Sequence, residues 1–287
     1  MKRGNALYVV ATPIGNLADM VPRAVEILKS VDLVAAEDTR RSRKLFHHFG
    51  IDTPLLAYHD HSDRKVLERL TVLLDSGKSV ALISDAGTPL ISDPGYRLVH
   101  HAHQVGWRVI PIPGPNAAVT ALSVAGLPSG RFRFEGFLPT TRAGRIRRLR
   151  ELESEPDTII FHEAPHRLLA CLEDMRDCLG AERPAVLARE LTKLFETIIN
   201  DSLQKLLERV DADPQQRRGE IVLLVAGAKP RNAAFSPDVE RLLSMLAAEL
   251  APKKAAALAA EISGVSKRKL YNWLVSQELP TGGAAKK

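Results

Sequence analysis

The feature that most constrains this fold is a strand-like run that leads into an unusual loop, between Val80 and Gly95. The apolar residues Val80–Ile83 are typical of a buried strand, and a helix-like segment begins at Tyr96. The loop between them holds two aspartates, two glycines, two prolines, two serines and a threonine. An ordinary strand-to-helix connection needs about 2–6 residues. This longer loop therefore indicates a ligand site at the carboxyl end of a strand, where open α/β sheets bind ligands.

Short apolar segments alternate with amphipathic ones through the first part of the chain. Such alternation predicts a mostly parallel sheet with flanking helices, and strands this apolar are covered on both faces. The expected strands are Leu7–Ala11, Leu33–Ala36, Leu55–Tyr58, Val80–Ile83 and Val109–Ile112. The expected helices are Asp19–Leu28, Arg40–Phe49, Asp63–Ser76, Tyr96–Gln104 and Ala117–Ala125.

Beyond Pro128–Gly130 the pattern changes to a second α/β unit with fewer strict alternations, for which a mixed sheet is predicted. A basic helix is expected around Arg142–Arg150. The expected strands are Phe132–Leu138, Thr158–Phe161, Ala185–Ala188 and Ile221–Ala226, and two further helices are expected at Arg167–Leu179 and Ser202–Val210.

The last part of the chain is predicted to be helical, at Pro237–Leu250, Lys253–Ile262 and Lys267–Val275. Ser266 is a favourable N-cap for the final helix. Two short helices joined by a glycine-containing turn resemble a helix-turn-helix, although three-helix arrangements are also common in other proteins. We therefore predict three domains: a parallel-sheet α/β domain at 1–118, a second α/β domain at 119–230, and a helical, helix-turn-helix-like tail at 231–287, for which nucleic-acid binding is one of two interpretations.

Positive charge is concentrated rather than spread evenly. The net charge is +6, and the stretch from Arg131 to Arg150 contains seven arginines against one acid, Glu135. Arginine suits bidentate recognition of phosphate or carboxylate, so this stretch is a candidate anion-binding surface. A solvated helix face is the alternative interpretation.

The sequence lacks the motifs of several common binding sites. The first strand leads into Thr12–Leu17, whose single glycine and proline cannot form the usual dinucleotide-binding turn. The histidines at His100, His101 and His103 have no acid or cysteine spaced to complete a metal site, so no metal is predicted. The two cysteines are seven positions apart, and no disulfide between them is predicted. No apolar run approaches the ~18 residues that a membrane helix needs. Both observations predict a cytoplasmic protein.

Polar loops follow other predicted strands as well. Glu37-Asp38-Thr39-Arg40 ends the second strand, His59-Asp60-His61 follows the third, and Pro113–Ala118 follows the fifth. Because parallel strands share a direction, these loops are expected on one rim of the sheet, where they would form a ligand site. Capping of a helix by Asp38 or Thr39, with an ion pair to Arg40, is compatible with that interpretation.

These loops resemble the tetrapyrrole methylase superfamily. Within it they are most similar to the bacterial enzymes that methylate the 2′-hydroxyl of a cytidine in 16S ribosomal RNA. The likeness extends from about Leu7 to Gln277. It is carried, in chain order, by Thr12–Leu17, Glu37–Arg40, Ser84–Pro89, Pro113–Pro115, Ala125–Pro128, Gly136–Pro139, Pro165–Leu168, Ala188–Lys193, Arg218–Glu220 and Lys253–Ala257.

The resemblance implies two α/β domains with S-adenosylmethionine in the cleft between them, and a small C-terminal helical domain. Thr88 stands where the superfamily's Gly-Asp-Pro cofactor loop has aspartate. The cofactor-binding residues that the resemblance implies are Pro13, Asp85, Gly87, Thr88, Pro89, Ile91, Ser92, Asn116, Ala117, Gly126, Leu127, Glu163, Ala188, Arg189, Gly219 and Glu220.

The implied reaction moves a methyl group from a sulfonium to a ribose hydroxyl, and a general base helps because that hydroxyl is a poor nucleophile. We favour Glu37, Asp38, Lys193 and Glu190 as the catalytic residues, with His59, Asp60 and Asp85 as further candidates for the base. Two positions depart from the family pattern: Arg41 stands where histidine is frequent, and His162 where tyrosine is usual.

The implied partner is 16S ribosomal RNA or the small ribosomal subunit, with the protein as a homodimer and no membrane. Two alternatives stay open. One is a methyltransferase acting on a carbon of a tetrapyrrole, whose carboxylates the arginines would bind, and the other is a non-catalytic RNA-binding protein. The residues predicted to contact RNA are Arg40, Arg142, Arg145, Arg147, Arg148, Lys267, Arg268 and Lys269.

Overall fold

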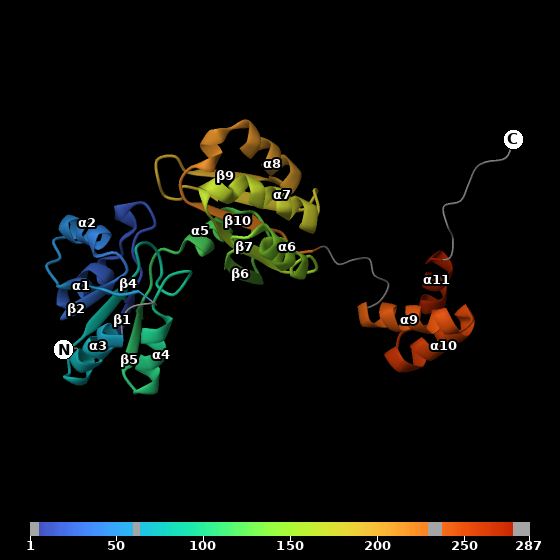
Figure 1. The fold of residues 1–287 in the computed structure, drawn as a ribbon, viewed down its shortest axis with the longest axis horizontal. Coiled ribbons are helices and arrows are strands. Elements are labelled where there is room, and N and C mark those ends of the chain that lie inside the picture. Colours follow the sequence, from blue (N-terminus) through green and yellow to red (C-terminus); the bar gives the residue numbers. More distant parts are fainter. Residues whose placement is uncertain (1–5, 60–63, 229–236, 278–287) are drawn as a thin grey trace. The chain divides into compact units, whose positions relative to one another are not determined.

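The computed structural model describes residues 6–59, 64–228 and 237–277. The chain forms two compact units, Met1–Ala228 and Lys229–Lys287, which are treated separately below. The first unit contains two five-stranded sheets and the second contains three helices (Figure 1). The predicted division of the first 230 residues at position 118 stays a prediction.

The first sheet has the strand order β3-β2-β4-β1-β5, and all of its pairings are parallel, as predicted. Two helices, α1 and α2, bury Leu28 and Phe46 on one face, and α3 and α4 bury Leu70 and Leu98 on the other. The strands are β1 (Ala6–Val10), β2 (Leu33–Ala36), β3 (Leu55–Ala57), β4 (Val80–Ile83) and β5 (Arg108–Ile112), and the helices are α1 (Pro22–Ser30), α2 (Thr39–Phe49), α3 (Arg64–Asp75) and α4 (Tyr96–Gln104).

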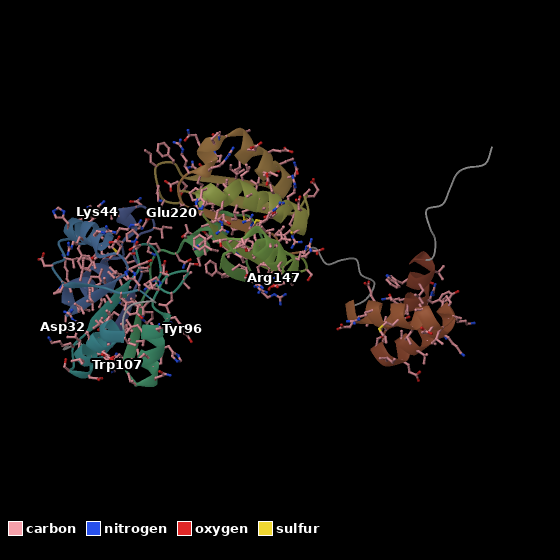
Figure 2. All side chains as sticks on the ribbon, in the orientation of Figure 1. Asp32, Lys44, Tyr96, Trp107, Arg147 and Glu220 are labelled. Carbon is pink, nitrogen blue, oxygen red and sulfur yellow. The ribbon has the colours of Figure 1, made fainter. Side chains whose placement is uncertain are left out.

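The first helix starts later than predicted. Asn16 caps a single 3-10 turn at Leu17–Asp19. α1 itself begins at Pro22, which suits the first helical position because proline has no N–H group that would need a partner there. On the other face of the sheet, the indole N–H of Trp107 (labelled in Figure 2) donates to Asp75 Oδ1 at 2.9 Å, which ties the end of α3 to the start of β5. Both faces of the strands are therefore covered, as their apolar sequences require.

The second sheet is mixed, as predicted, with the order β6-β7-β10-β8-β9. Only the β6–β7 pairing is parallel. Its edge strand β9 (Thr197–Ser202) was missing from the sequence prediction, because it is half-exposed and ends in the polar run Asn200-Asp201-Ser202. The other strands are β6 (Phe132–Phe137), β7 (Thr158–Glu163), β8 (Pro184–Arg189) and β10 (Ile221–Val225).

Helices cover both faces of the second sheet as well. One face packs on α6 (Arg142–Glu151), α7 (Leu168–Leu179) and α8 (Leu203–Ala212). The other packs on α5 (Ala117–Val124), whose Ala121 and Leu122 meet Val186 and Leu224. Since α5 follows β5 of the first sheet but packs on the second, the loop before it connects the two sheets.

The tail unit consists of α9 (Pro237–Glu249), α10 (Pro252–Ser263) and α11 (Lys267–Gln277), as the sequence predicted. Gly264 ends α10 in the left-handed conformation, with φ of 69°, which glycine adopts without strain. Small alanines on α10 pack against Leu243, Leu270 and Leu274. Among the helices of the described residues, none combines the length and apolar character needed to cross a membrane.

Candidate active site

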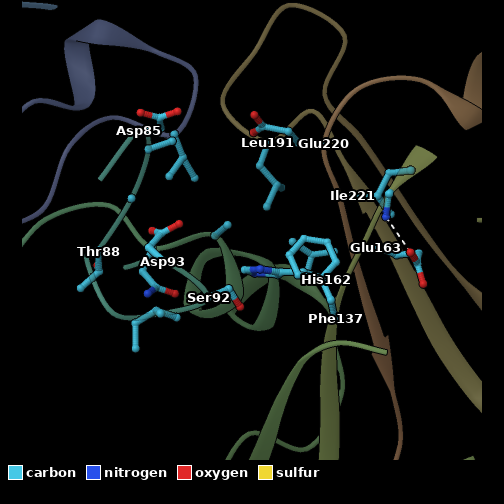
Figure 3. A pocket seen from close by; sticks show the side chains of 18 of the residues that line it. Asp85, Thr88, Ser92, Asp93, Phe137, His162, Glu163, Leu191, Glu220 and Ile221 are labelled. Atoms are coloured by element: carbon cyan, nitrogen blue, oxygen red, sulfur yellow. Dashed lines mark hydrogen bonds between the residues drawn. The ribbon is translucent and has the colours of Figure 1, made fainter. Parts of the chain in front are cut away.

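A cavity of about 420 Å³ opens in the first unit where the loops after β2, β4 and β5 face the second sheet. Asp85 and Asp93 lie on one side of it, and His162, Leu191 and Ile221 contribute to the other (Figure 3). The structure therefore brings together three of the four loops that were expected on one rim, those after β2, β4 and β5, whereas Asp60 and His61 of the loop after β3 lie outside the described residues. The predicted residues that line the cavity are Glu37, Asp85, Gly87, Thr88, Ile91, Ser92, Asn116, Ala117, Glu163, Ala188, Gly219 and Glu220.

Hydrogen bonds tie the long loop after β4 to its neighbours. Gly87 and Thr12 exchange two backbone hydrogen bonds, at 2.9 and 3.0 Å, and the Thr88 hydroxyl donates to the carbonyl of Pro115 at 3.0 Å. Gly87 has φ of 80°, which glycine adopts without steric cost. Leu90 and Ser92 are also left-handed, with φ of 75° and 66°. This backbone conformation is strained for residues other than glycine, and proteins retain such strain mainly at functional sites.

Three carboxylates, from Glu37, Asp85 and Asp93, line one side of the cavity. Asp85 accepts hydrogen bonds from the backbone N–H of Asp38 and from the Arg41 guanidinium, both at 2.9 Å. Glu37 accepts from the backbone N–H of Asp85 at 3.4 Å. Arg41, which departs from the family's histidine, thus neutralises one of the three acids.

Asp93 was missed as a site residue, although it lies in the same loop as Asp85. Burial raises the pKa of its carboxyl to about 6, with a further contribution from the negative charges of Glu37 and Asp85. Burial also raises the pKa of Glu37, and Asp85 adds to that shift. A second aspartate within an unusually polar loop was the signal from which Asp93 could have been found.

The Asp38 side chain instead caps α2. It accepts the backbone N–H of Arg40 at 2.8 Å and pairs with the Arg40 guanidinium at 3.0 Å. These bonds lower the pKa of Asp38 to about 2, its hydrogen bond to the Arg40 side chain having the largest effect. A carboxylate this acidic is a poor proton acceptor, so the structure supports its capping function over the predicted catalytic one. Asp60 lies outside the described residues.

Lys193 and Glu190 form an ion cluster with Glu220 beside the cavity. The Lys193 ammonium lies 2.8 Å from Glu190 and 3.2 Å from Glu220, and its stem crosses above Gly15, where an added Cβ would lie 2.5 Å from Lys193 Cγ. Burial lowers the pKa of Lys193, but the hydrogen bonds that its ammonium donates to Glu190 and Glu220, together with their negative charges, outweigh that effect and the net shift is upward. Lys193 is therefore charged and cannot accept a proton. Neither Lys193 nor Glu190 lines the cavity itself.

The remaining predicted cofactor residues do not line this cavity. Pro13 lines a smaller cavity of about 190 Å³ next to it. Pro89, Gly126 and Leu127 lie outside both of them. The Arg189 side chain is buried in the scaffold, where it donates to the carbonyl of Phe195 and the hydroxyl of Thr197, both at 3.0 Å. Their assignment to the cofactor site therefore stays a prediction.

Aromatic rings form part of the second-sheet wall. His162, the other departure from the family pattern, points toward Ser92 (Figure 3) and packs edge-on against Phe134 and Phe137, with ring centroids 5.1 and 5.6 Å apart. Burial lowers its pKa, so the imidazole is neutral near pH 7. Its buried Nε2 has no hydrogen-bond partner among the described residues, which leaves a polar group for a ligand to bind. The part of the chain that the structure describes holds no cluster of three or more side chains suited to a metal ion.

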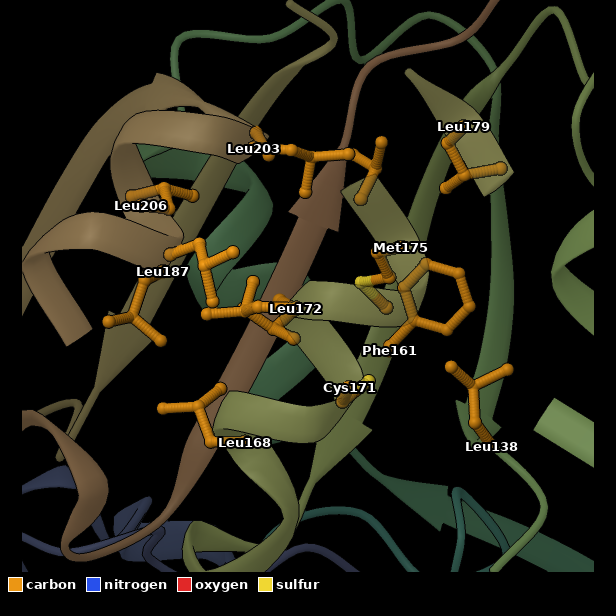
Figure 4. Packing of buried hydrophobic residues seen from close by; sticks show 14 of the residues in the cluster. Leu138, Phe161, Leu168, Cys171, Leu172, Met175, Leu179, Leu187, Leu203 and Leu206 are labelled. Atoms are coloured by element: carbon orange, nitrogen blue, oxygen red, sulfur yellow. The ribbon is translucent and has the colours of Figure 1, made fainter. Parts of the chain in front are cut away.

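The arginines of α6 are mostly occupied by acids. Arg145 is 5% exposed and lies 2.6 Å from Asp174 of α7, which also pairs with Arg142 at 3.1 Å. α7 is anchored through Leu172 and Met175 in the buried cluster of the second sheet (Figure 4). We therefore withdraw Arg145 from the predicted RNA contacts, because a phosphate would have to break a buried ion pair to reach it.

The other predicted RNA contacts differ in accessibility. Arg148 pairs with Glu135 at 2.7 Å and with Glu151 at 2.6 Å. Arg147 is exposed, and no acid among the described residues pairs with it. Arg40 is exposed beside Asp38. Lys267, Arg268 and Lys269 are exposed at the start of α11, in the tail unit.

Comparison with known proteins supports the same family that the motifs indicated. Residues 6–207 match the family model of tetrapyrrole (corrin/porphyrin) methylases. Residues 233–278 match a model described as the RsmI C-terminal HTH domain.

The curated relatives match almost the whole chain. The ribosomal RNA small subunit methyltransferase I of Pseudomonas aeruginosa is 57% identical over 95% of this chain and 97% of its own length. The protein of the same name from Escherichia coli O157:H7 is 53% identical over 95% of both chains.

Solved structures share the fold at low sequence identity. The cobalt precorrin-4 methyltransferase CbiF matches with a TM-score of 0.58 and 15% identity, over 77% of this chain and 94% of that one. A uroporphyrin-III C-methyltransferase from Thermus thermophilus, complexed with S-adenosyl homocysteine, matches with a TM-score of 0.54 and 17% identity, over 78% of this chain and 97% of its own. Likenesses this distant show the fold alone.

Proposed function

This chain belongs to the tetrapyrrole methylase family, and we propose that it is an S-adenosylmethionine-dependent enzyme. Its proposed reaction is methylation of the 2′-hydroxyl of a cytidine in the decoding region of 16S ribosomal RNA. The observation that carries the proposal is the identity of more than half of the residues with ribosomal RNA small subunit methyltransferases over nearly the full chain. A cytoplasmic homodimer acting on the small ribosomal subunit is part of the proposal.

The residues around the cavity fit the cofactor. Its volume of about 420 Å³ lies within the usual range of ligand pockets, which is about 300–1,000 Å³. Ile14, Leu191 and Val222 offer apolar surface to an adenosine, and the carboxylates opposite suit a ligand that carries positive charge. When bound, S-adenosylmethionine supplies a methyl group already activated by its sulfonium. The backbone around Gly87 and Thr88 and the start of α5 at Asn116 and Ala117 are the proposed binding surfaces.

Asp93 is the proposed proton acceptor for the ribose hydroxyl. Its pKa of about 6 leaves it ionised at neutral pH, yet basic enough to take a proton as the oxygen forms its bond to the methyl carbon. Glu37 already accepts the Asp85 N–H, and Asp85 is occupied by Arg41. Both of those carboxylates are better placed to hold the loop than to receive a proton. Activity is therefore expected to fall as pH drops below about 6.

The alternative reactions are less well supported. Uroporphyrin and precorrin methyltransferases share the fold at 15–18% identity, whereas the ribosomal RNA enzymes are 48–57% identical. A tail matching a helix-turn-helix model is also what a nucleic-acid substrate favours. A purely RNA-binding function would not require a cavity lined by five carboxylates, three of them on one side.

The decisive experiment offers the protein labelled S-adenosylmethionine with three acceptors: assembled small subunits, free 16S RNA and a polycarboxylated tetrapyrrole. Mass spectrometry then maps the labelled nucleotide. We expect label on one cytidine ribose and none on the tetrapyrrole. Transfer to the tetrapyrrole would establish the first alternative, and failure of the protein to bind the cofactor in a calorimetric titration would establish the second.

A pair of variants on α5 tests the location of the cofactor. Ala117 lines the cavity, so Ala117→Trp fills it, and cofactor binding should fall below detection. Val119, two positions away, is 55% exposed and outside the cavity lining, so Val119→Trp should bind like the wild type. Equal binding by both variants would place the cofactor elsewhere. Light scattering of the wild type tests the homodimer.

A further inference from the structure

The helix α2 has an unusual composition for its position at the site. Its eleven residues include four cations, Arg40, Arg41, Arg43 and Lys44, and two histidines, but no acid. Its buried side faces the first sheet through Ser42 and Phe46. All four cations are exposed (Figure 2 shows Lys44 at the outer edge).

Two of these cations have no acidic partner in the part of the chain that the structure describes. Arg40 pairs with Asp38 and Arg41 with Asp85, but neither Arg43 nor Lys44 is paired with an acid among the described residues. Neighbouring cations on one short helix repel each other, and no ion pair within the described residues offsets this repulsion for Arg43 and Lys44. Such an arrangement suits an anionic partner that supplies the missing charge.

A second cavity lies directly beside this helix. It measures about 190 Å³, and Arg41, Lys44 and Leu45 of α2 line it together with the loop at Pro13 and Gly15. Arg41 and Asp85 line both this cavity and the larger one, so their 2.9 Å ion pair stands at the junction of the two. A chain whose ribose reaches Asp93 in the large cavity can therefore place its neighbouring groups against α2.

We propose that α2 and the small cavity beside it bind the phosphodiester backbone of the RNA next to the target ribose. The inference rests on the proposed function and names the surface by which that substrate is held. Arginine and lysine neutralise phosphates without reading sequence, and such contacts set the register of a nucleic acid on a protein. α2 would thus position the ribose, while the cavity selects the reacting group.

The sequence predicted α6 instead, and the two helices can be compared directly. Arg142 and Arg145 share the carboxylate of Asp174, and Arg148 is held by two glutamates, so an RNA would have to compete with acids already in place. On α2 the phosphates would meet two cations that pair with no acid of residues 6–59, 64–228 or 237–277. In addition, α2 begins two residues after Glu37, within the site itself.

The test is a charge reversal on α2 with a matched control. Arg43→Glu/Lys44→Glu changes the net charge by the same amount as Arg69→Glu/Lys78→Glu. In the control, Arg69 is exposed on α3, which covers the opposite face of the sheet, and Lys78 is exposed before the amino end of β4. Binding of 16S RNA and of small subunits is measured against salt concentration, and cofactor affinity is measured by calorimetry.

We expect the α2 variant to lose at least ~10-fold in RNA affinity and to reduce the salt slope by about 2, one for each phosphate contact. The control should bind RNA like the wild type, and both should retain cofactor affinity and the thermal midpoint of the wild type. Equal RNA binding by the two variants, or equal losses, would overturn the inference. A wild-type protein that methylates no RNA would instead overturn the proposed function.

Discussion

The two basic helices of the first unit, α2 and α6, look alike as sequences and differ in what surrounds them. On α6, Arg145 is buried against Asp174, and Arg142 and Arg148 also pair with acids. On α2, Arg43 and Lys44 extend from the helix without an acid among the described residues. Clustered arginines therefore indicate an anion partner without identifying it. For Arg142, Arg145 and Arg148 of α6, the anions belong to the protein itself.

The acids near the two helices also differ in whether a cation neutralises them, but here the neutralised acid lies at α6 and the other lies near α2. Asp174, beneath α6, is almost fully buried but has two arginine partners. Asp93, near the start of α2, pairs with no cation of the described segments and has two other carboxylates close by, so burial and like charge raise its pKa to about 6. An acid neutralised by arginines stabilises the fold, whereas an acid left without a cation is available for proton transfer.

The largest effect is expected from breaking the buried pair of α6. Arg145→Ala leaves the Asp174 carboxylate buried with one fewer partner, and should lower the free energy of unfolding by about 3–5 kcal/mol. Urea denaturation measures this, with Arg147→Ala as the control on the same helix. Because Arg147 is exposed and pairs with no acid that the structure describes, its loss should change stability by no more than ~0.5 kcal/mol. Equal stability of the two variants would remove the structural contrast between α6 and α2.

Asp93→Asn tests the unneutralised acid. Removal of a general base lowers kcat by about 10²-fold or more, and the acidic limb of the pH–rate profile near pH 6 should disappear. The raised pKa means that the folded state binds this proton more tightly than the unfolded state, so the stability due to this group is lost as pH rises from about 4 to about 6. The variant should therefore melt above the wild type at pH 7, and the difference should vanish near pH 4. An unchanged pH–rate profile would exclude Asp93 as the base.

The smallest effect is expected from Asp38→Asn, which also serves as the control for Asp93. Asparagine caps helices about as well as aspartate, so the turnover rate should stay within ~2-fold of the wild type. Asp38→Ala, which cannot cap α2, should lower the thermal midpoint while leaving the acidic limb of the rate profile in place. A large loss of turnover in Asp38→Asn would return this residue to the catalytic group that the sequence suggested.

Much of the site was predictable because parallel strands share a direction. Once β2, β4 and β5 were recognised, the loops containing Glu37, Asp85 and Asn116 had to lie on one rim. Asp93 was not predictable in the same way. Its raised pKa depends on how deeply the loop buries it and on its distance from Glu37 and Asp85, and neither is encoded in the local sequence.

By itself, the sequence determined most of the strands and helices, the parallel first sheet and the loops that meet at its rim, although it missed β9. It also determined the family to which the chain belongs. Periodicity, glycine and proline positions and motif order are local properties, which is why the sequence carries them. Only the tertiary structure decided which charges remain available. Arg145 meets Asp174 from 29 positions away, and Asp85 meets Arg41 from 44. Electrostatic energy depends on distance in space and on burial, so a charge is neutralised or left available to a partner only when the chain has folded.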